Sequence, residues 1–599
     1  MGSAARNVQI SRALLDIAGP NHRLTDDALA KLIAAETGQR KRKAQSELAG
    51  LKESLLDACA VEVKGLSTSG GEQRFVLAKP GGYLVLLCDN CPSFRTMLWS
   101  VVTRPTAGGG WRQHLGTEQN PLQVVLYEDA TTPGNAVDGA NPRKYSAWYW
   151  TVRQFSKWLL SQDFGWFHCM VALTREVNVL DGGKAALCDL VLREFFVHEP
   201  LTKGVVIDFG HCKLRLFFGF DSFLGDLDSH RECFGWMAAG SNKYCWKCKN
   251  VLRAGANVQS DYFVDTRCGD VRRFDPQSDA EAFHAADTLA SLVARSRSNA
   301  EVKKAEEVYG LHHVPRGPLL DMELREVLKP VTGSRVDGMH VWFSQGLLQH
   351  EVYLFFGDAG RLRPPLKFQD LNRFCNDEAW KFPGYALRPR NFVANLFRDA
   401  KITDEGKVRL WASEALVCIP VIRHYAETVV ARHPEGNMMQ LQIKSLVAMC
   451  EAAEAWVSFS KRRVDSKEFY MEKWKLYSRA RERAYSGTDP KPKLHFAAHC
   501  DGEVDCFPLE RKHKLSLLHG THAVSRDGLK WSKHILARAM LHQISKFLEI
   551  GNREQHLEQP VVFCQELTAL IGLDAYVSEK AVLEYVSVRR GDVVEVRAR

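Results

Sequence analysis

The sequence predicts a mixed α/β fold in which a sheet-based core is interrupted by a large, mostly helical insertion. Two observations along the chain support this prediction. Between residues 120 and 225, short apolar runs alternate with helical patterns, whereas beyond residue 280 the hydrophobic spacing is almost entirely helical. A third observation is length: 599 residues are enough for roughly three or four structural units.

Each expected element follows from apolar spacing and from the turn residues that bound it. In the first part of the chain we expect short helices before residue 60 and strands at 75–77 and 83–87. In the core we expect strands at 122–127, 166–173, 177–180, 204–207 and 214–220, with helices at 145–160 and 185–196. The later helices are expected at 282–296, 337–356, 412–430 and 438–459, and a last strand at 593–596.

These elements suggest five segments. They are an N-terminal region of unknown role (1–115), the first part of the sheet core (116–240), a helical insertion (241–490), a closing segment (491–530) and a C-terminal region (531–599).

Composition excludes several classes of protein. Apolar residues make up 45% and charged residues 25%, which argues against wholesale disorder, collagen or a plain coiled coil. No window approaches the roughly 18 continuous apolar residues of a membrane span, and Met1 to Gly19 carries no secretory signal. We therefore expect an intracellular protein without a membrane partner. Its net charge of +9 is compatible with a nucleic-acid partner.

Two ligand pairs predict a zinc site. Cys245 and Cys248 form a CxxC motif, which places two thiolates on one tight turn. His495 and His499, separated by three residues, put two imidazoles on the same face of a helix. Together the four side chains can complete a tetrahedral structural Zn²⁺ site, although two buried cysteines and two unrelated histidines remain the alternative. A second CxxC, Cys88 to Cys91, has no nearby histidine pair and is expected to be structural.

Three acidic residues form the second constellation. Asp129 ends an expected strand, Asp226 follows another strand, and Glu510 lies in an expected helix shortly after the histidine pair. Acids at strand ends and at a helix start can converge on one edge of a sheet and bind two Mg²⁺ ions. Such a pair of ions suits phosphoryl transfer at DNA. A single aspartate at a strand end is more often a turn or cap residue, so the prediction depends on all three converging.

The order of these motifs resembles the DDE transposases of the CACTA class, which are related in catalytic core to the Transib transposases and the V(D)J recombinase. The residues that carry the resemblance are, in order, Asp129, Asp226, Cys245-x2-Cys248, Asp337-Gly338-Met339-His340, His495-x3-His499 and Glu510-Arg511. The resemblance spans about residues 120–520. It implies an RNase H-like core that carries the acids, and a zinc-linked helical insertion between the second acid and the third.

The resemblance implies metal-dependent DNA cleavage followed by strand transfer, with Asp129, Asp226 and Glu510 as catalytic residues. Asp228 is an alternative second acid and Glu351 an alternative third acid, while His340 is a further candidate zinc ligand or active-site residue. A protein of this kind would bind DNA and would be nuclear in a eukaryote. Whether it forms a homo-oligomer is left open. The competing functions are a catalytically inactive DNA-binding protein derived from a transposase, an RNase H-like nuclease, and a zinc-stabilised scaffold without a nucleic-acid role.

A basic segment at 461–483 leaves two interpretations open. Its lysines and arginines are interleaved with Trp474 and Tyr477 and could neutralise backbone phosphates. The same pattern also fits a solvated helix with internal ion pairs, because Glu472 and Glu482 are present.

Overall fold

The computed structural model describes most of the chain from residue 24 to residue 551. The gaps in that range are 107–109, 133–143, 199, 257–259, 296–297, 368–369, 372, 375–401, 404–406, 409, 411, 462–465, 503, 524 and 526. Beyond residue 551 it describes the short strands β16 (His556–Glu558), β17 (Val561–Val562), β18 (Tyr576–Val577), β19 (Lys580–Val582) and β20 (Ser587–Arg589). The strand expected at 593–596 lies outside the described residues.

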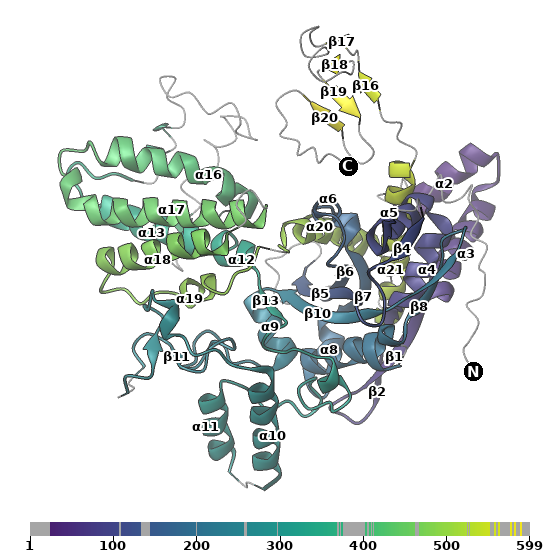
Figure 1. The fold of residues 1–599 in the computed structure, drawn as a ribbon, viewed down its shortest axis with the longest axis horizontal. Helices are drawn as coiled ribbons and strands as arrows, with labels where there is room; N and C mark the ends of the chain where they lie inside the picture. Colours follow the sequence, from purple (N-terminus) through teal and green to yellow (C-terminus); the bar gives the residue numbers. More distant parts are fainter. Residues whose placement is uncertain are drawn as a thin grey trace.

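A mixed seven-stranded sheet forms the core, in the order β1-β2-β7-β6-β5-β10-β13 (Figure 1). Its strands are β1 (Ala60–Leu66), β2 (Glu72–Ala78), β5 (Leu122–Thr131), β6 (Tyr145–Val152), β7 (Phe167–Leu173), β10 (Phe218–Gly225) and β13 (Ser334–Val336). In the first part of this order, β1-β2-β7-β6-β5, each strand is antiparallel to the next. In the last part, β5, β10 and β13 run parallel to one another. Strands separated widely in sequence therefore end at the same edge of the sheet.

Helices cover both faces of this sheet. On one face lie α20 (Phe507–His522) and α21 (Gly528–Gly551): Tyr149 of β6 contacts α20, and Tyr145 packs against Trp531 of α21. On the other face lies α8 (Gly183–Arg193), which continues into a π-helical turn, Glu194–His198, where Phe195 packs against Trp150. Because β6 is fully buried on both faces, its sequence lacks the polar alternation of a half-exposed strand.

The N-terminal region joins the same body. Its helices are α2 (Asp26–Thr37), α3 (Lys41–Cys59), α4 (Pro80–Asn90) and α5 (Pro92–Val102), and α3 and α5 pack against α21. Since β1 and β2 also extend the main sheet, helices α2 to α5 with these strands, and helix α21, are layers of the core, whereas strands β16 to β20 form small sheets of their own.

Two hairpins lie near the starts of strands β5 and β10, at the end of the sheet opposite to the one where these strands finish. The first consists of β3 (Thr103–Pro105) and β4 (Trp111–Gln113), and the second of β8 (Val205–Asp208) and β9 (Lys213–Leu216). They precede β5 and β10, respectively, and lie near the points where those strands begin.

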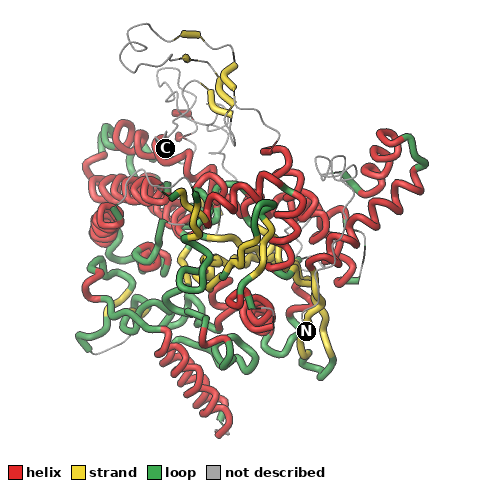
Figure 2. The backbone as a smooth tube through the Cα atoms, turned by 45° about the vertical axis from the view of Figure 1, so that its right-hand side comes forward, coloured by secondary structure: helices red, strands yellow, loops and turns green. Residues whose placement is uncertain are grey.

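The region predicted as one insertion is divided by β13, which belongs to the main sheet. Helix α9 (Leu227–Phe234) ends the first core segment; within the predicted insertion, before β13, come the pair β11 (Val251–Leu252) and β12 (Val264–Asp265), α10 (Asp279–Arg295) and α11 (Asn299–Tyr309). After β13 come α12 (Gly338–Trp342), α13 (Leu347–Ala359), β14 (Ile402–Thr403), β15 (Lys407–Val408), α16 (Ala412–Tyr425), α17 (Gln440–Ser460) and α18 (Lys467–Ala484), and α19 (Lys493–Ala497) follows in the closing segment. Figures 1 and 2 show the later helices packed beside one another, away from the sheet. The mostly helical character of this region is as predicted.

Several predicted elements were wrong in type. The helix expected at 145–160 is strand β6 followed by the short helix α6 (Lys157–Leu160), because an apolar run buried on both faces does not reveal its period. The strand expected at 83–87 is helix α4, which Pro80 begins at its first position. The strand expected at 177–180 is instead the end of the short helix α7 (Thr174–Val177) and the turn after it. The single helix expected at 337–356 is two helices.

Among the described residues, none of the helices combines the length and the apolar character that crossing a bilayer requires.

Candidate metal centres

The parallel pair β5 and β10 places the first two acids side by side. Gly225 is the register partner of Glu128, so the residues that follow them, Asp226 and Asp129, lie at the same edge of the sheet. Asp226 caps helix α9, and its Oδ1 accepts a hydrogen bond of 2.6 Å from the backbone N–H of Ser229. Asp129 faces α20, whereas Glu128 faces α8 and pairs with Lys184 at 3.1 Å. Strand alternation thus turns only one of the two adjacent carboxylates toward the site.

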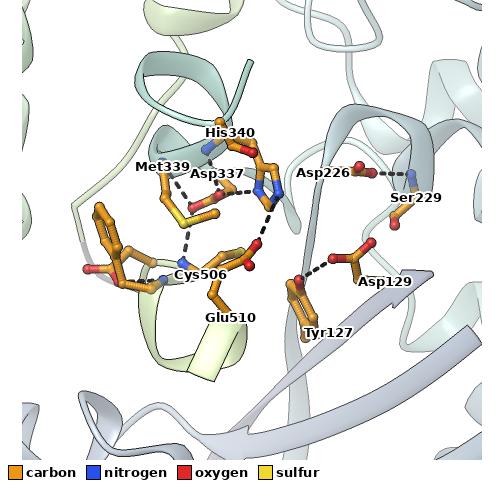
Figure 3. A network of polar contacts seen from close by, with 12 residues as sticks. Tyr127, Asp129, Asp226, Ser229, Asp337, Met339, His340, Cys506 and Glu510 are labelled. Carbon is orange, nitrogen blue, oxygen red and sulfur yellow. Dashed lines mark hydrogen bonds and ion pairs between the residues drawn. The ribbon is translucent and has the colours of Figure 1, made fainter. Parts of the chain in front are cut away.

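Helix α20 brings Glu510 to the same place from nearly 300 residues further along the chain. One ligand atom from each of Asp129, His340 and Glu510 lies within 4.8 Å of the others. Figure 3 shows these side chains and Asp226 arranged around a common space, with Asp129 and Asp226 on one side and Glu510 and His340 on the other. Asp129 and Glu510 are therefore brought together, and Asp226 faces the same space beside Asp129 without belonging to the group of ligand atoms within 4.8 Å.

The electrostatics of this cluster follow from burial and from mutual repulsion. Burial and the neighbouring carboxylate of Asp226 raise the pKa of Asp129 to about 8. Burial also raises the pKa of Glu510, although His340 opposes that shift. Burial tends to raise the pKa of Asp226, but the charge of His340 and the hydrogen bond from the Ser229 N–H outweigh it, so the pKa is lowered. Within the described chain, no lysine or arginine forms an ion pair with these three carboxylates.

Such a set of oxygen donors suits a hard divalent cation such as Mg²⁺, which takes carboxylate and water oxygens. The residues present therefore fit the Mg²⁺ ions that the sequence predicts. They do not by themselves distinguish Mg²⁺ from other oxygen-seeking ions such as Mn²⁺.

Asp337 and His340 form a carboxylate–histidine pair beside the acids. Asp337 caps α12, and its Oδ2 lies 2.6 Å from Nδ1 of His340, which turns Nε2 toward Oε1 of Glu510 at 3.7 Å. Burial opposes protonation, but the hydrogen bond and charge of Asp337 raise the pKa of His340 to about 9. Asp337 Oδ1 also accepts the backbone N–H of Cys506 at 3.1 Å. Asp337 thus fixes the start of α20 relative to α12.

A cavity of about 450 Å³ opens beside this pair and shares Asp226 and His340 with the acidic cluster. Basic side chains also line it: Arg231, Lys491 and Lys493. Of the three acids, Asp226 is therefore reachable from a recess whose walls carry basic side chains together with Asp228.

A buried polar layer behind Asp129 was not predicted. Tyr127 donates to Asp129 Oδ2 at 3.0 Å, and Nε2 of His513 lies 3.3 Å from the Tyr127 hydroxyl and 3.5 Å from Asp129 Oδ2. The chain continues from His513 Nδ1 to the Tyr149 hydroxyl at 3.4 Å, and from Tyr149 through Ser516 to His168. Burial lowers the pKa of His513 to about 3, so this ring is neutral at pH 7.

Sequence signals for this layer did exist. His513 follows Glu510 by three residues on one helix, which places both on the same face. Tyr127 precedes Asp129 by two residues on one strand and shares its face. What the sequence did not indicate is that α20 packs on this strand.

The two alternative acids lie elsewhere. The side chain of Asp228 is 76% exposed and pairs with Arg231 at 2.6 Å. Glu351 is fully buried among α13, α17 and α18, where it accepts hydrogen bonds from Ser445 and Tyr477 and lies 3.8 Å from Nε of Arg481. Glu351 therefore faces the helical core and Asp228 faces solvent, whereas Asp226 faces Asp129 and His340.

The two predicted ligand pairs also meet. Ligand atoms of Cys245, Cys248, His495 and His499 lie within 4.8 Å of one another. The Sγ-to-Nε2 distances are 3.2 Å for Cys245–His495, 3.3 Å for Cys248–His499 and 3.7 Å for Cys245–His499, and the two Nε2 atoms are 3.0 Å apart. Tetrahedral Zn²⁺ with bonds of about 2.0–2.3 Å requires ligand-to-ligand edges of about 3.3–3.8 Å. The donor set and its spacing therefore fit zinc to within about half an ångström.

The surroundings of one of the two sulfur atoms, that of Cys245, favour a metal-binding thiolate. Burial alone would raise the pKa of Cys245, but a hydrogen bond with Cys248 and the two imidazoles lower it well below its usual value. The backbone N–H of Lys247 also donates to Cys245 Sγ at 3.3 Å. His340 is not part of this group, so the structure separates it from the predicted zinc ligands.

Lys493 connects the two centres. It begins helix α19, which carries His495, and its Nζ donates to the carbonyls of His340 at 2.8 Å and Ser344 at 2.9 Å. The histidine pair is thus attached to the helix that holds His340.

One face of the basic segment at 461–483 is a packing surface. Arg462 and Arg463 lie outside the described residues, and the rest forms most of α18. Trp474, Tyr477 and Arg481 are buried, and Lys473 pairs with Glu451 of α17 at 2.9 Å. Trp474 and Tyr477 therefore belong to the helical core, whereas Lys467, Arg479 and Arg483 are exposed. Cys88 and Cys91 are likewise buried, as expected of a structural pair.

Comparison with known proteins does not identify a family: no protein-family model matches the chain, and no curated protein matches it significantly.

Proposed function

We propose that this chain is a DDE-type DNA transposase, or a protein derived from one, built on an RNase H-like core. The strand order supports the fold assignment. Taken as strands one to five, β5, β6, β7, β10 and β13 follow the order 3-2-1-4-5, with the first three antiparallel and the last two parallel to the first. That is the arrangement expected of an RNase H-like sheet. The first two acids then fall at the ends of its first and fourth strands.

The observation that carries the functional proposal is the convergence of the acids. Asp129 and Glu510, from a strand and a later helix, have ligand atoms within 4.8 Å of His340, and Asp226, at a helix cap, faces the same space (Figure 3). Three partly buried carboxylates share one imidazole and have no lysine or arginine ion-pair partner among the described residues, so their mutual repulsion destabilises the fold and a bound divalent cation would offset it. Such an arrangement is typical of a functional site.

Each residue would have a defined task. Asp129, Asp226 and Glu510 would hold two Mg²⁺ ions, which when bound activate the attacking oxygen and stabilise the leaving oxygen of a phosphodiester. Asp337 orients His340, and His340 faces Glu510. Lys491, in the wall of the adjoining cavity, would provide positive charge next to the place where DNA phosphates would lie, whereas Arg231 in the same wall is paired with Asp228.

The zinc centre would be structural. Its four protein ligands leave no open position for a substrate. It would hold α19 to the loop that follows α9, and through Lys493 it would stabilise the position of His340.

The test is cleavage of plasmid and oligonucleotide DNA by the purified protein with Mg²⁺ or Mn²⁺. We expect Asp129→Asn and Glu510→Gln each to reduce cleavage by at least a hundredfold without lowering the melting temperature. Asp57→Asn is the control, because it removes an exposed carboxylate on α3 that belongs neither to the acidic cluster nor to the adjoining cavity. Binding of Mn²⁺, followed by electron paramagnetic resonance, should weaken in Asp129→Asn and not in the control.

The outcomes separate the alternatives. Cleavage by Asp129→Asn at the parent rate would refute the assignment of the acids. Metal binding without cleavage of any DNA or of an RNA–DNA hybrid would indicate a derived protein that has lost catalysis. Cleavage confined to RNA–DNA hybrids would favour an RNase H-like nuclease.

A further inference from the structure

An aromatic and basic surface lies on the two hairpins β3–β4 and β8–β9. Trp99 of α5 contacts Trp111 of β4 with ring centroids 4.5 Å apart, and it contacts His211 and Phe209 of the second hairpin at 4.4 Å and 5.1 Å. The side chain of Gln113 also reaches the backbone carbonyl of Arg215 at 3.5 Å. The two hairpins, about 100 residues apart in sequence, therefore form one continuous surface.

Trp111 is unusual among the tryptophans that the structure describes, because it is the one classed as exposed, at 43%. Two arginines flank it on the same hairpin. Arg104 and Arg112 are direct register partners across β3 and β4, and both are exposed. Like charges directly opposite each other destabilise an antiparallel pair.

No acidic side chain in the described part of the chain relieves this repulsion. Neither Arg104 nor Arg112 forms an ion pair there. The pKa of His114 is lowered, first by burial and then by the charges of these two arginines. On the second hairpin Arg215 and Lys203 are also exposed, and the nearby Asp208 already pairs with Lys213 at 3.5 Å. The surface thus keeps an uncompensated positive charge around an exposed indole ring.

We propose that this surface, defined by Arg104, Trp111, Arg112 and Arg215, binds single-stranded nucleic acid. Guanidinium groups neutralise backbone phosphates, and an exposed tryptophan stacks on an unpaired base. A duplex offers phosphates but no free base face, so the exposed indole favours a single strand. An acidic peptide would use the arginines but would leave the indole without a stacking partner.

This surface is distinct from the acidic cluster. Phe217, which precedes β10, hydrogen-bonds to Gly116 and Leu122 beside the first hairpin, whereas Asp226 follows the other end of β10. The eight residues of β10 span about 26 Å at roughly 3.3 Å per residue. A strand bound there would lie well away from the acids, so the surface holds nucleic acid at a second place.

The experiment measures binding of a fluorescent 20-nucleotide single strand and of the matching duplex, without added magnesium, across a range of salt concentrations. We expect Arg104→Gln/Arg112→Gln to weaken single-strand binding and to reduce the slope of log affinity against log salt by about 1.4, or about 0.7 for each lost phosphate contact. Trp111→Ala should weaken single-strand binding about tenfold and duplex binding much less.

The melting temperature of the variants is a second, independent measurement. Because Arg104→Gln removes a like-charge pair, its melting temperature should be equal to or above that of the parent while its affinity falls. Arg361→Gln is the matched control, since Arg361 is 82% exposed and already paired with Asp358. Phe469→Ala, which removes an aromatic ring 41% exposed on α18, is the control for Trp111→Ala.

Three results would overturn the proposal: unchanged affinity and salt slope in the arginine variants, equal losses in the controls, or a lower melting temperature that accounts for the weaker binding. Equal effects of Trp111→Ala on single strand and duplex would refute base stacking. Asp129→Asn should bind the oligonucleotide like the parent, so failure of the cleavage proposal and failure of this one are distinguishable.

Discussion

The predicted zinc centre gives the sharpest stability prediction. Cys248→Ser removes one of four ligands that join two segments, and His495 lies 247 positions after Cys248. If the chain-entropy relation for a cross-link is applied to a loop of this length, losing the connection costs about 5 kcal/mol. For a unit of 150–250 residues that corresponds to a fall in melting temperature of about 10 °C or more.

The assay combines zinc content, measured by elemental analysis of the purified protein, with thermal unfolding followed by circular dichroism. We expect one zinc per parent chain and none in Cys248→Ser. Adding a zinc chelator to the parent should reproduce most of the shift, because both treatments remove the same connection.

Cys88→Ser is the matched control. Cys88 belongs to the other CxxC motif and is only 1% exposed, but it has no histidine pair nearby. This variant can lose stability through the core, yet its zinc content should equal that of the parent. The absence of zinc from the parent, or equal melting temperatures for parent and Cys248→Ser, would refute the zinc assignment.

Three further predictions concern buried polar groups. His513→Phe should raise the concentration of Mn²⁺ needed for half-maximal binding by about tenfold or more, because His513 lies against Oδ2 of Asp129 and orients that carboxylate toward the metal; His513→Gln, which keeps a hydrogen-bonding group, should recover part of the loss. Equal metal affinity in the parent and His513→Phe would show that His513 does not position Asp129. Glu351→Ala should destabilise the helical region by about 3–5 kcal/mol in urea unfolding, because it leaves Arg481 buried without its partner. Any folded Glu351→Ala protein should still cleave DNA at the parent rate, and loss of cleavage would favour Glu351 as the third acid. Burial and the nearby carboxylate of Asp321 raise the pKa of Asp189 to about 7, so its contribution to stability is complete below about pH 4 and is lost as the pH rises to about 7. Asp189→Asn should therefore flatten the dependence of the melting temperature on pH between 4 and 7, and an unchanged profile would contradict that assignment.

Local pattern was enough to locate the chemistry along the chain. The CxxC and His-x3-His spacings identify ligand pairs because each pair is set by one turn or one helical turn. Asp129 and Asp226 could be recognised because both follow apolar runs that end abruptly. Helix-period spacing also indicated the long helices α10, α16 and α17.

Local pattern failed where burial on both sides removes the alternation. The run that became β6 packs against Trp531 on one face and Phe195 on the other, so its apolar residues have no polar side to reveal a period. Trp474 and Arg481 illustrate the same limit on α18, where a sequence rich in charge turned out to form a packing surface on one face.

The sequence by itself therefore determined which residue types could hold metal ions and the order in which they occur. Only the tertiary structure decided which acids share a space. Asp226 and Asp228 are two residues apart, but the register between β5 and β10 sets Asp226 beside Asp129 and leaves Asp228 exposed. Glu510, rather than Glu351, faces His340 because α20 packs on the sheet through Tyr127 and His513. Contacts of this kind join residues hundreds of positions apart, and no local spacing in the sequence encodes them.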